Sequence, residues 1–107
     1  MARYGKDTPL PPRAVLRLAR DFFGPTGDLG LRLTKDTLAE VGFAGGGGTV
    51  EVSARPKLGD LQVTEVTILA IEFDPWAERF LVALTDAERG EGPLARLGRW
   101  LAGRFGR

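Results

Sequence analysis

The 107-residue sequence contains neither cysteine nor histidine, and these two absences narrow its chemistry. Without cysteine there is no disulfide, no thiolate metal site and no cysteine nucleophile. Without histidine the chain lacks the commonest general base and the commonest transition-metal ligand. Catalysis would have to rely on carboxylates, lysines, hydroxyl groups or the single tyrosine, Tyr4. The composition therefore argues against an enzyme without excluding one, and it predicts no metal and no cofactor.

Long hydrophobic runs are also missing. The longest wholly apolar runs are ILAI at 68–71 and FLVAL at 80–84. Both are far shorter than the roughly 20 residues that cross a bilayer as a helix. The first 13 residues lack the apolar segment of a signal peptide. We therefore expect a cytoplasmic protein.

Charge is balanced over the whole chain but not along it. The formal net charge is +1, yet residues 89–107 carry five arginines against Glu91 alone. Arginines outnumber lysines twelve to three, which suits a GC-rich coding sequence, and a thermophilic source is one interpretation of that ratio. The charge pattern thus sets the C-terminal residues apart from the remainder.

The chain is short enough to be one domain, and its patterns predict the α+β class. Residues 1–10 are expected to be a tether. Pro11 and Pro12 suit the first turn of a helix that runs to Phe23, where Gly24 and Pro25 end it. Alternating apolar residues predict an antiparallel sheet of about four strands, at 29–34, 37–43, 49–55 and 61–73. One or two C-terminal helices complete the predicted order α-β-β-β-β-α-α.

Two interpretations remain open for residues 37–43. Thr37 and Glu40 have the spacing of a capping box, which favours a short helix. Alternation of apolar and polar residues favours a strand instead, with Lys35-Asp36 as the turn of a hairpin. We favour the hairpin.

Gly45, Gly46, Gly47 and Gly48 form an uninterrupted glycine run, which predicts a flexible hairpin or lid loop. Phosphate-binding loops place glycines between a strand and a helix, and the Walker type ends in Gly-Lys followed by Ser or Thr. Here the run leads into a predicted strand and no lysine follows. Close approach of another chain segment to this backbone is the remaining interpretation.

The stretch Leu61–Phe73 predicts the longest strand, followed by a helix that begins at Asp74-Pro75. Around residues 66–71 both of its faces are apolar, which burial on one side does not explain. Either a bulge shifts the register, or a helix or a second subunit covers the other face. We therefore assign Val66, Ile68 and Ala70 to a candidate homodimer interface.

Residues 93–107 predict an amphipathic basic tail helix. Leu97, Trp100, Leu101 and Phe105 form its apolar face, and the basic residues are Arg96, Arg99, Arg104 and Arg107. We favour docking of the apolar face on the sheet or on a twin subunit. Attachment to an anionic membrane surface or to single-stranded nucleic acid stays open.

Glu65 and Glu72 share predicted strand faces with apolar residues. A carboxylic acid buried among apolar side chains acquires a raised pKa and can act as an acid or a base. The alternative, which we favour, is that these acids and Glu51 lie at strand ends or on a solvated strip, paired to Arg32 or Arg55 across the sheet.

The order of elements, the glycine run and the segment EFDPW at 72–76 together resemble small uncharacterised bacterial proteins over residues 12–84. The arrangement is also faintly similar to the helix-grip fold of START-like lipid-binding domains, although the chain is several strands shorter. That second resemblance would imply an apolar ligand, and neither resemblance implies functional residues.

The sequence therefore predicts a small cytoplasmic interaction or structural module that forms a homodimer. An apolar small-ligand binder or enzyme is the alternative, and attachment through the tail to a membrane or nucleic acid is a further one. The ligand, partner and pathway are not predicted.

Overall fold

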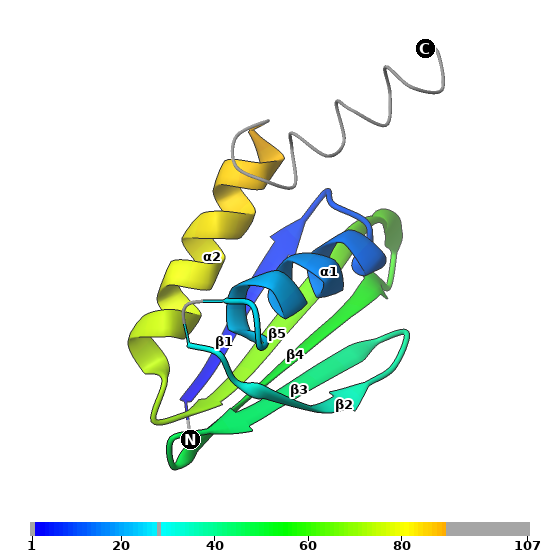
Figure 1. The fold of residues 1–107 in the computed structure, drawn as a ribbon. Helices are drawn as coiled ribbons and strands as arrows, with labels where there is room; N and C mark the ends of the chain where they lie inside the picture. Colours follow the sequence, from blue (N-terminus) through cyan, green and yellow to red (C-terminus); the bar gives the residue numbers. More distant parts are fainter. Residues whose placement is uncertain (1, 28, 90–107) are drawn as a thin grey trace, which may run out of the picture.

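A computed structural model describes residues 2–27 and 29–89. Along the chain, its elements are a strand, a helix, four strands and a second helix (Figure 1). They are β1 (Ala2–Thr8), α1 (Pro12–Phe23), β2 (Arg32–Asp36), β3 (Glu40–Gly45), β4 (Gly48–Lys57), β5 (Asp60–Ile71) and α2 (Asp74–Glu88). The α+β class is confirmed, with five strands rather than about four.

The five strands form one antiparallel sheet in the order β1-β5-β4-β3-β2. Strands β2 to β5 follow one another as hairpins, and β1 joins from the other side by pairing with β5. Both helices lie on the same face of this sheet, with α1 across β3 and β4 and α2 across β1 and β5 (Figure 1). The opposite face is not covered by any described residue.

Residues 2–8 are a strand, which corrects the prediction of a tether for residues 1–10. Ala2, Tyr4 and Lys6 are half-buried on the helix side, and Arg3 and Gly5 are exposed on the other side. Only Tyr4 is a large apolar residue in this alternation, so the strand signal is weak. The covering element is α2, about 70 residues later in the chain.

The hairpin interpretation of residues 37–43 is confirmed, with its turn at 37–39 instead of Lys35-Asp36. The hydroxyl oxygen of Thr37 accepts hydrogen bonds from the backbone N–H groups of Ala39 and Glu40, at 3.2 and 2.9 Å. Thr37 therefore satisfies backbone donors just as a helix cap would, which explains why the sequence fits both interpretations.

Both helices have the predicted proline in their first turn but no side-chain cap. Pro11 is the N-cap of α1, and Thr8 instead accepts a hydrogen bond from Leu10 N–H at 3.3 Å. Asp74 is the first residue of α2, where its charge favours the positive end of the helix dipole, and Phe73 occupies the cap position. The predicted tail helix at 93–107 lies outside the described residues.

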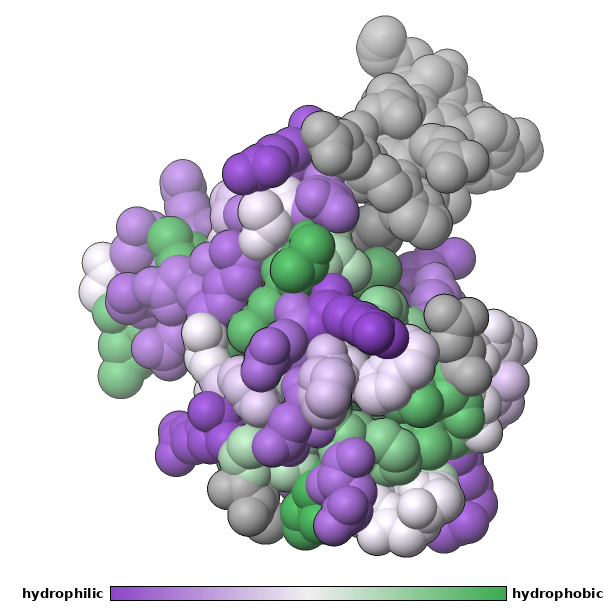
Figure 2. All heavy atoms as spheres, turned by 90° about the vertical axis from the view of Figure 1, so that its left-hand side faces the viewer, coloured by the Kyte–Doolittle hydropathy of each residue, from purple (hydrophilic) through white to green (hydrophobic). Residues whose placement is uncertain are grey.

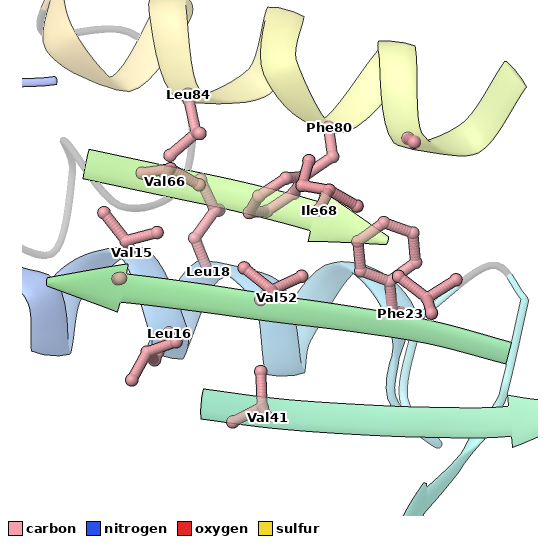
Figure 3. Close-up of a cluster of buried hydrophobic side chains, with 14 of the residues drawn as sticks. Val15, Leu16, Leu18, Phe23, Val41, Val52, Val66, Ile68, Phe80 and Leu84 are labelled. Carbon is pink, nitrogen blue, oxygen red and sulfur yellow. The ribbon is translucent and has the colours of Figure 1, made fainter. Parts of the chain in front are cut away.

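The core fills the space between the helices and the covered face of the sheet (Figure 3). The rings of Phe23, Phe43 and Phe80 are buried, and the centroid of Phe23 lies 5.7 Å from that of Phe43 and 5.3 Å from that of Phe80. Phe22 packs edge-on against Phe23 and Phe80 at 4.9 and 5.5 Å. Burying each large apolar side chain contributes about 1.5–3 kcal/mol, so this layer dominates the stability of the fold.

Candidate interaction surface

The three strand residues that the sequence assigned to an interface lie in the core. Val66, Ile68 and Ala70 are 2%, 0% and 0% exposed beneath the helices of their own chain. They are core residues of one subunit, which corrects their assignment to a contact between subunits. Helices α1 and α2 therefore cover this apolar side of β5, for which the sequence analysis expected a covering helix or subunit.

The other side of β5 is the side left open by the described residues. Val63 and Leu69 are half-buried there by their neighbours in the sheet, and Ile71 is 39% exposed. The tail residues predicted for the interface and the basic face all lie outside the described residues, and these assignments stay predictions: Leu97, Trp100, Leu101, Phe105, Arg96, Arg99, Arg104 and Arg107.

The glycine run forms a tight hairpin between β3 and β4. Gly46 and Gly47 have φ angles of 58° and 86°, as the two-residue turns of β-hairpins require. A Cβ on Gly48 would collide with the carbonyl oxygen of Ile71 and lie 2.7 Å from the Phe73 ring. The run is therefore the turn of a hairpin, one of the two structures predicted for it, and its backbone lies close to the junction of β5 and α2.

Both predicted buried acids are exposed. Glu65 lies directly opposite Arg55 in the register of β5 and β4. Arg55 is one of the two arginines that we expected opposite a solvated acid. Glu72 lies between β5 and α2 with a left-handed φ of 74°, a conformation that disfavours any residue with a Cβ. Neither carboxylate is buried among apolar side chains, which corrects the interpretation of them as buried acids.

A shallow depression on the open face is too small for a ligand. It has a volume of about 40 Å³, whereas ligand pockets span roughly 300–1,000 Å³. Four of its six lining residues are polar, and the lining consists of Glu40, Glu51, Val52, Ser53, Thr67 and Leu69. Within residues 2–27 and 29–89, no three acids converge to hold a metal, and no helix is long and apolar enough to cross a membrane.

The two edges of the sheet differ in regularity. Edge strand β2 has five residues, all exposed, and a register shift between Leu33 and Lys35. Edge strand β1 has seven residues in unbroken register with β5, from Ala2 opposite Ala70 to Thr8 opposite Thr64. Its outward backbone N–H and C=O groups have no strand partner among the described residues. Such a regular row of backbone donors and acceptors can pair with another strand.

Helix α2 lies along the same edge and adds side chains to it. The Lys6 ammonium is 3.2 Å from the Glu88 carboxylate, and that oxygen has no well-aligned hydrogen bond from the described residues. Partial burial, together with the charges of Asp74 and Glu78, raises the pKa of the Tyr4 phenol above its ordinary value. Figure 2 looks onto this side of the molecule, where hydrophobic and hydrophilic residues are interspersed.

One apolar residue of α2 extends this edge. Leu81 is half-buried against the core and shares the helix row of Asp74, Glu78 and Glu88. We define the edge surface as the outer side of β1 together with Leu81. The sequence prediction missed it because β1 was interpreted as a tether, although the alternation of Arg3, Gly5 and Asp7 with Tyr4 and Lys6 is its signal.

An antiparallel five-stranded sheet with two helices on one face defines the class of this protein. The chain matches no protein-family model and no curated protein. Among solved structures it is similar to the crystal structure of DR_A0006 from Deinococcus radiodurans, a Northeast Structural Genomics Consortium target. The TM-score is 0.55 at 18% sequence identity, over 83% of this chain and 98% of that chain. This likeness shows the fold and supplies no activity.

Proposed function

We propose that this protein is a small interaction module that works as a homodimer, joined through strand β1. The observation that carries the proposal is the seven-residue β1 edge, which pairs with β5 without a bulge and leaves its outer backbone row free of described strands. Natural sheets usually protect such edges because they recruit further strands.

The opposite edge shows the protection that β1 lacks. Strand β2 is short, fully exposed and bulged, whereas β1 is longer and pairs in unbroken register. These features of β2 discourage strand addition. A second copy joined there would meet an irregular ladder, so β1 is the edge that suits a partner.

The core argues for this function over ligand binding. An apolar ligand held under the sheet would need the space that Phe23, Phe43 and Phe80 occupy. An antiparallel strand pair across a twofold axis needs no cavity, because backbone hydrogen bonds and side chains on both faces supply the contact.

Sedimentation equilibrium of the full chain over a wide range of concentrations tests the proposal. We expect a species of twice the chain mass. Amide hydrogen exchange should show that protection of β1 rises with concentration while protection of β2 does not. A monomer at every concentration, or protection that rises in β2 instead of β1, contradicts the proposal.

A further inference from the structure

We infer that two copies meet in a single register, with the twofold axis through Gly5 and α2 of each copy beside α2 of the other. This inference rests on the proposed dimer and specifies its geometry. It follows from the backbone register of β1, from the charges along β1 and from the position of α2.

Strand geometry restricts where the axis can lie. In an antiparallel pair, directly opposed residues point to the same face of the sheet and either exchange both backbone hydrogen bonds or none. A twofold axis must therefore pass beside a residue and not between two residues. Gly5 is the midpoint of Ala2–Thr8, so an axis there pairs all seven residues of β1.

The neighbouring registers are worse. An axis at Lys6 places two ammonium groups opposite each other, which is unfavourable for directly paired strands. An axis at Tyr4 leaves Asp7 and Thr8 without partners in the other β1. Gly5 offers open space, since a Cβ built there meets only the carbonyl oxygen of Val66 at an ordinary contact distance of 3.8 Å.

The Gly5 register makes the charges of β1 complementary. On the open face, Arg3 of each copy lies opposite Asp7 of the other, which gives two symmetric opposite-charge pairs. Asp7 already accepts a hydrogen bond from Lys57 through Oδ2 at 2.5 Å, and its Oδ1 is available to a second donor.

On the helix face, Tyr4 of each copy lies opposite Lys6 of the other. The Tyr4 ring lies in the field of the Asp74 and Glu78 carboxylates, so a lysine brought there meets negative charge. Cross-strand pairs are thus favourable on both faces of the joined sheet.

Helix α2 places a half-buried apolar residue, Leu81, near the same axis. Asp74 and Glu78 lie close enough to Tyr4 to act on its charge, and Glu88 reaches Lys6. The part of α2 between these contacts therefore passes alongside Gly5, and it contains Leu81, which shares the helix row of Asp74, Glu78 and Glu88. Because the axis is twofold, each Leu81 approaches the Leu81 of the other copy, which covers a side chain that is half-buried in one copy.

A single engineered cysteine tests the register, because the natural chain has none. Residues on the axis pair with themselves at a Cα separation of about 4.5–5.5 Å, within the range of about 4.4–6.8 Å that a disulfide spans. Gly5→Cys should therefore form a covalent dimer on mild oxidation. Leu33→Cys on the opposite edge is the matched control and should stay uncrosslinked.

Charge exchange tests the same register without a covalent bond. Arg3→Glu and Asp7→Arg should each weaken self-association roughly tenfold or more, because each creates two like-charge pairs. An equal mixture of the two variants should restore a heterodimer with both pairs complementary. Arg55→Glu, on the same open face but away from the edge, should leave association unchanged. Thermal unfolding confirms that every variant is folded.

The outcomes separate the register from the dimer. A chain that sediments as a dimer but forms no Gly5→Cys crosslink and no rescued heterodimer overturns the register and leaves the proposed function standing. A folded chain that stays monomeric in every experiment overturns both. Crosslinking through Leu33→Cys instead would assign the contact to β2 and also overturn the register.

Discussion

Strand β5 has two apolar faces that look alike in the sequence and behave differently in the structure. Val66, Ile68 and Ala70 are at most 2% exposed under the helices, whereas Ile71 and Leu61 on the other face are 39% and 76% exposed. An apolar alternation shows which residues share a face but not which face receives cover. Only the placement of α1 and α2 decides that.

The difference between the two faces also distinguishes the contact that we propose, at the β1 edge, from the contact that the sequence predicted, on one face of β5. The covered face is already filled by the protein's own helices, and the open face carries polar residues such as Ser53 and Thr67 around a shallow depression. The edge of the sheet combines unpaired backbone groups with side chains from both faces. The position most suited to a second copy is therefore where the two faces meet.

Truncating one residue on each face should give the largest difference. Ile68→Ala removes a fully buried side chain and leaves a cavity, so we expect the free energy of unfolding to fall by about 3–4 kcal/mol. Leu69→Ala, one position along on the open face, should lower it by about 1 kcal/mol or less, because its side chain is only half-buried. Urea denaturation at one fixed protein concentration measures both, and equal losses would contradict the assignment of the faces.

Adding a methyl group to a glycine on each face should give the next largest difference. Gly48→Ala forces a Cβ against the Ile71 carbonyl and the Phe73 ring, and we expect a loss of about 1–3 kcal/mol. Gly5→Ala meets open space on the other face and should be neutral or stabilise by up to about 0.5 kcal/mol. A tolerated Gly48→Ala in thermal denaturation would mean that the hairpin does not pack on this junction.

Local signals in the sequence predicted the elements that local physics determines. Pro12 and Gly24 mark the two ends of α1 because proline favours the first turn and Gly24 with Pro25 stops the helix. The predicted strand 61–73 differs from β5 by one residue at the start and two at the end. These elements depend on neighbours in the sequence.

Distant contacts explain what the sequence could not predict. Strand β1 is half-buried because α2 covers it, and its weak alternation gives no hint of that cover. The candidate site depends on the same fact, since β1 becomes a sheet edge only by pairing with β5. Glu65 lies opposite Arg55, one of the two arginines considered for it, because that pairing depends only on the register of adjacent strands.

Breaking an ion pair on one side of the sheet or on the other should change the free energy of unfolding by more similar amounts than truncating apolar residues does. The Lys6–Glu88 pair on the helix side is 24% and 18% exposed, and Glu88→Gln should cost about 1 kcal/mol because it leaves a half-buried ammonium group unpaired. The Arg55–Glu40 pair on the open side is 63% and 34% exposed, and Arg55→Met should cost less than about 0.5 kcal/mol. A double-mutant cycle for each pair isolates the coupling energy, and a larger value for Arg55–Glu40 would reverse the expected order.

Alkaline titration should give the smallest effect and compares one group on each side of the sheet. The hydrogen bond and charge of Asp7 raise the pKa of Lys57, and partial burial and two carboxylates raise the pKa of Tyr4. In the unfolded chain tyrosine titrates near pH 10 and lysine near pH 10.4, so the folded state retains both protons to higher pH. By linkage, the stability that these two groups contribute is fully present below about pH 10 and declines as the pH rises through their folded pKa values. Tyr4→Phe and Lys57→Met should each flatten part of this decline in urea denaturation between pH 8 and about pH 11, and a decline unchanged in both variants would mean that other groups cause it.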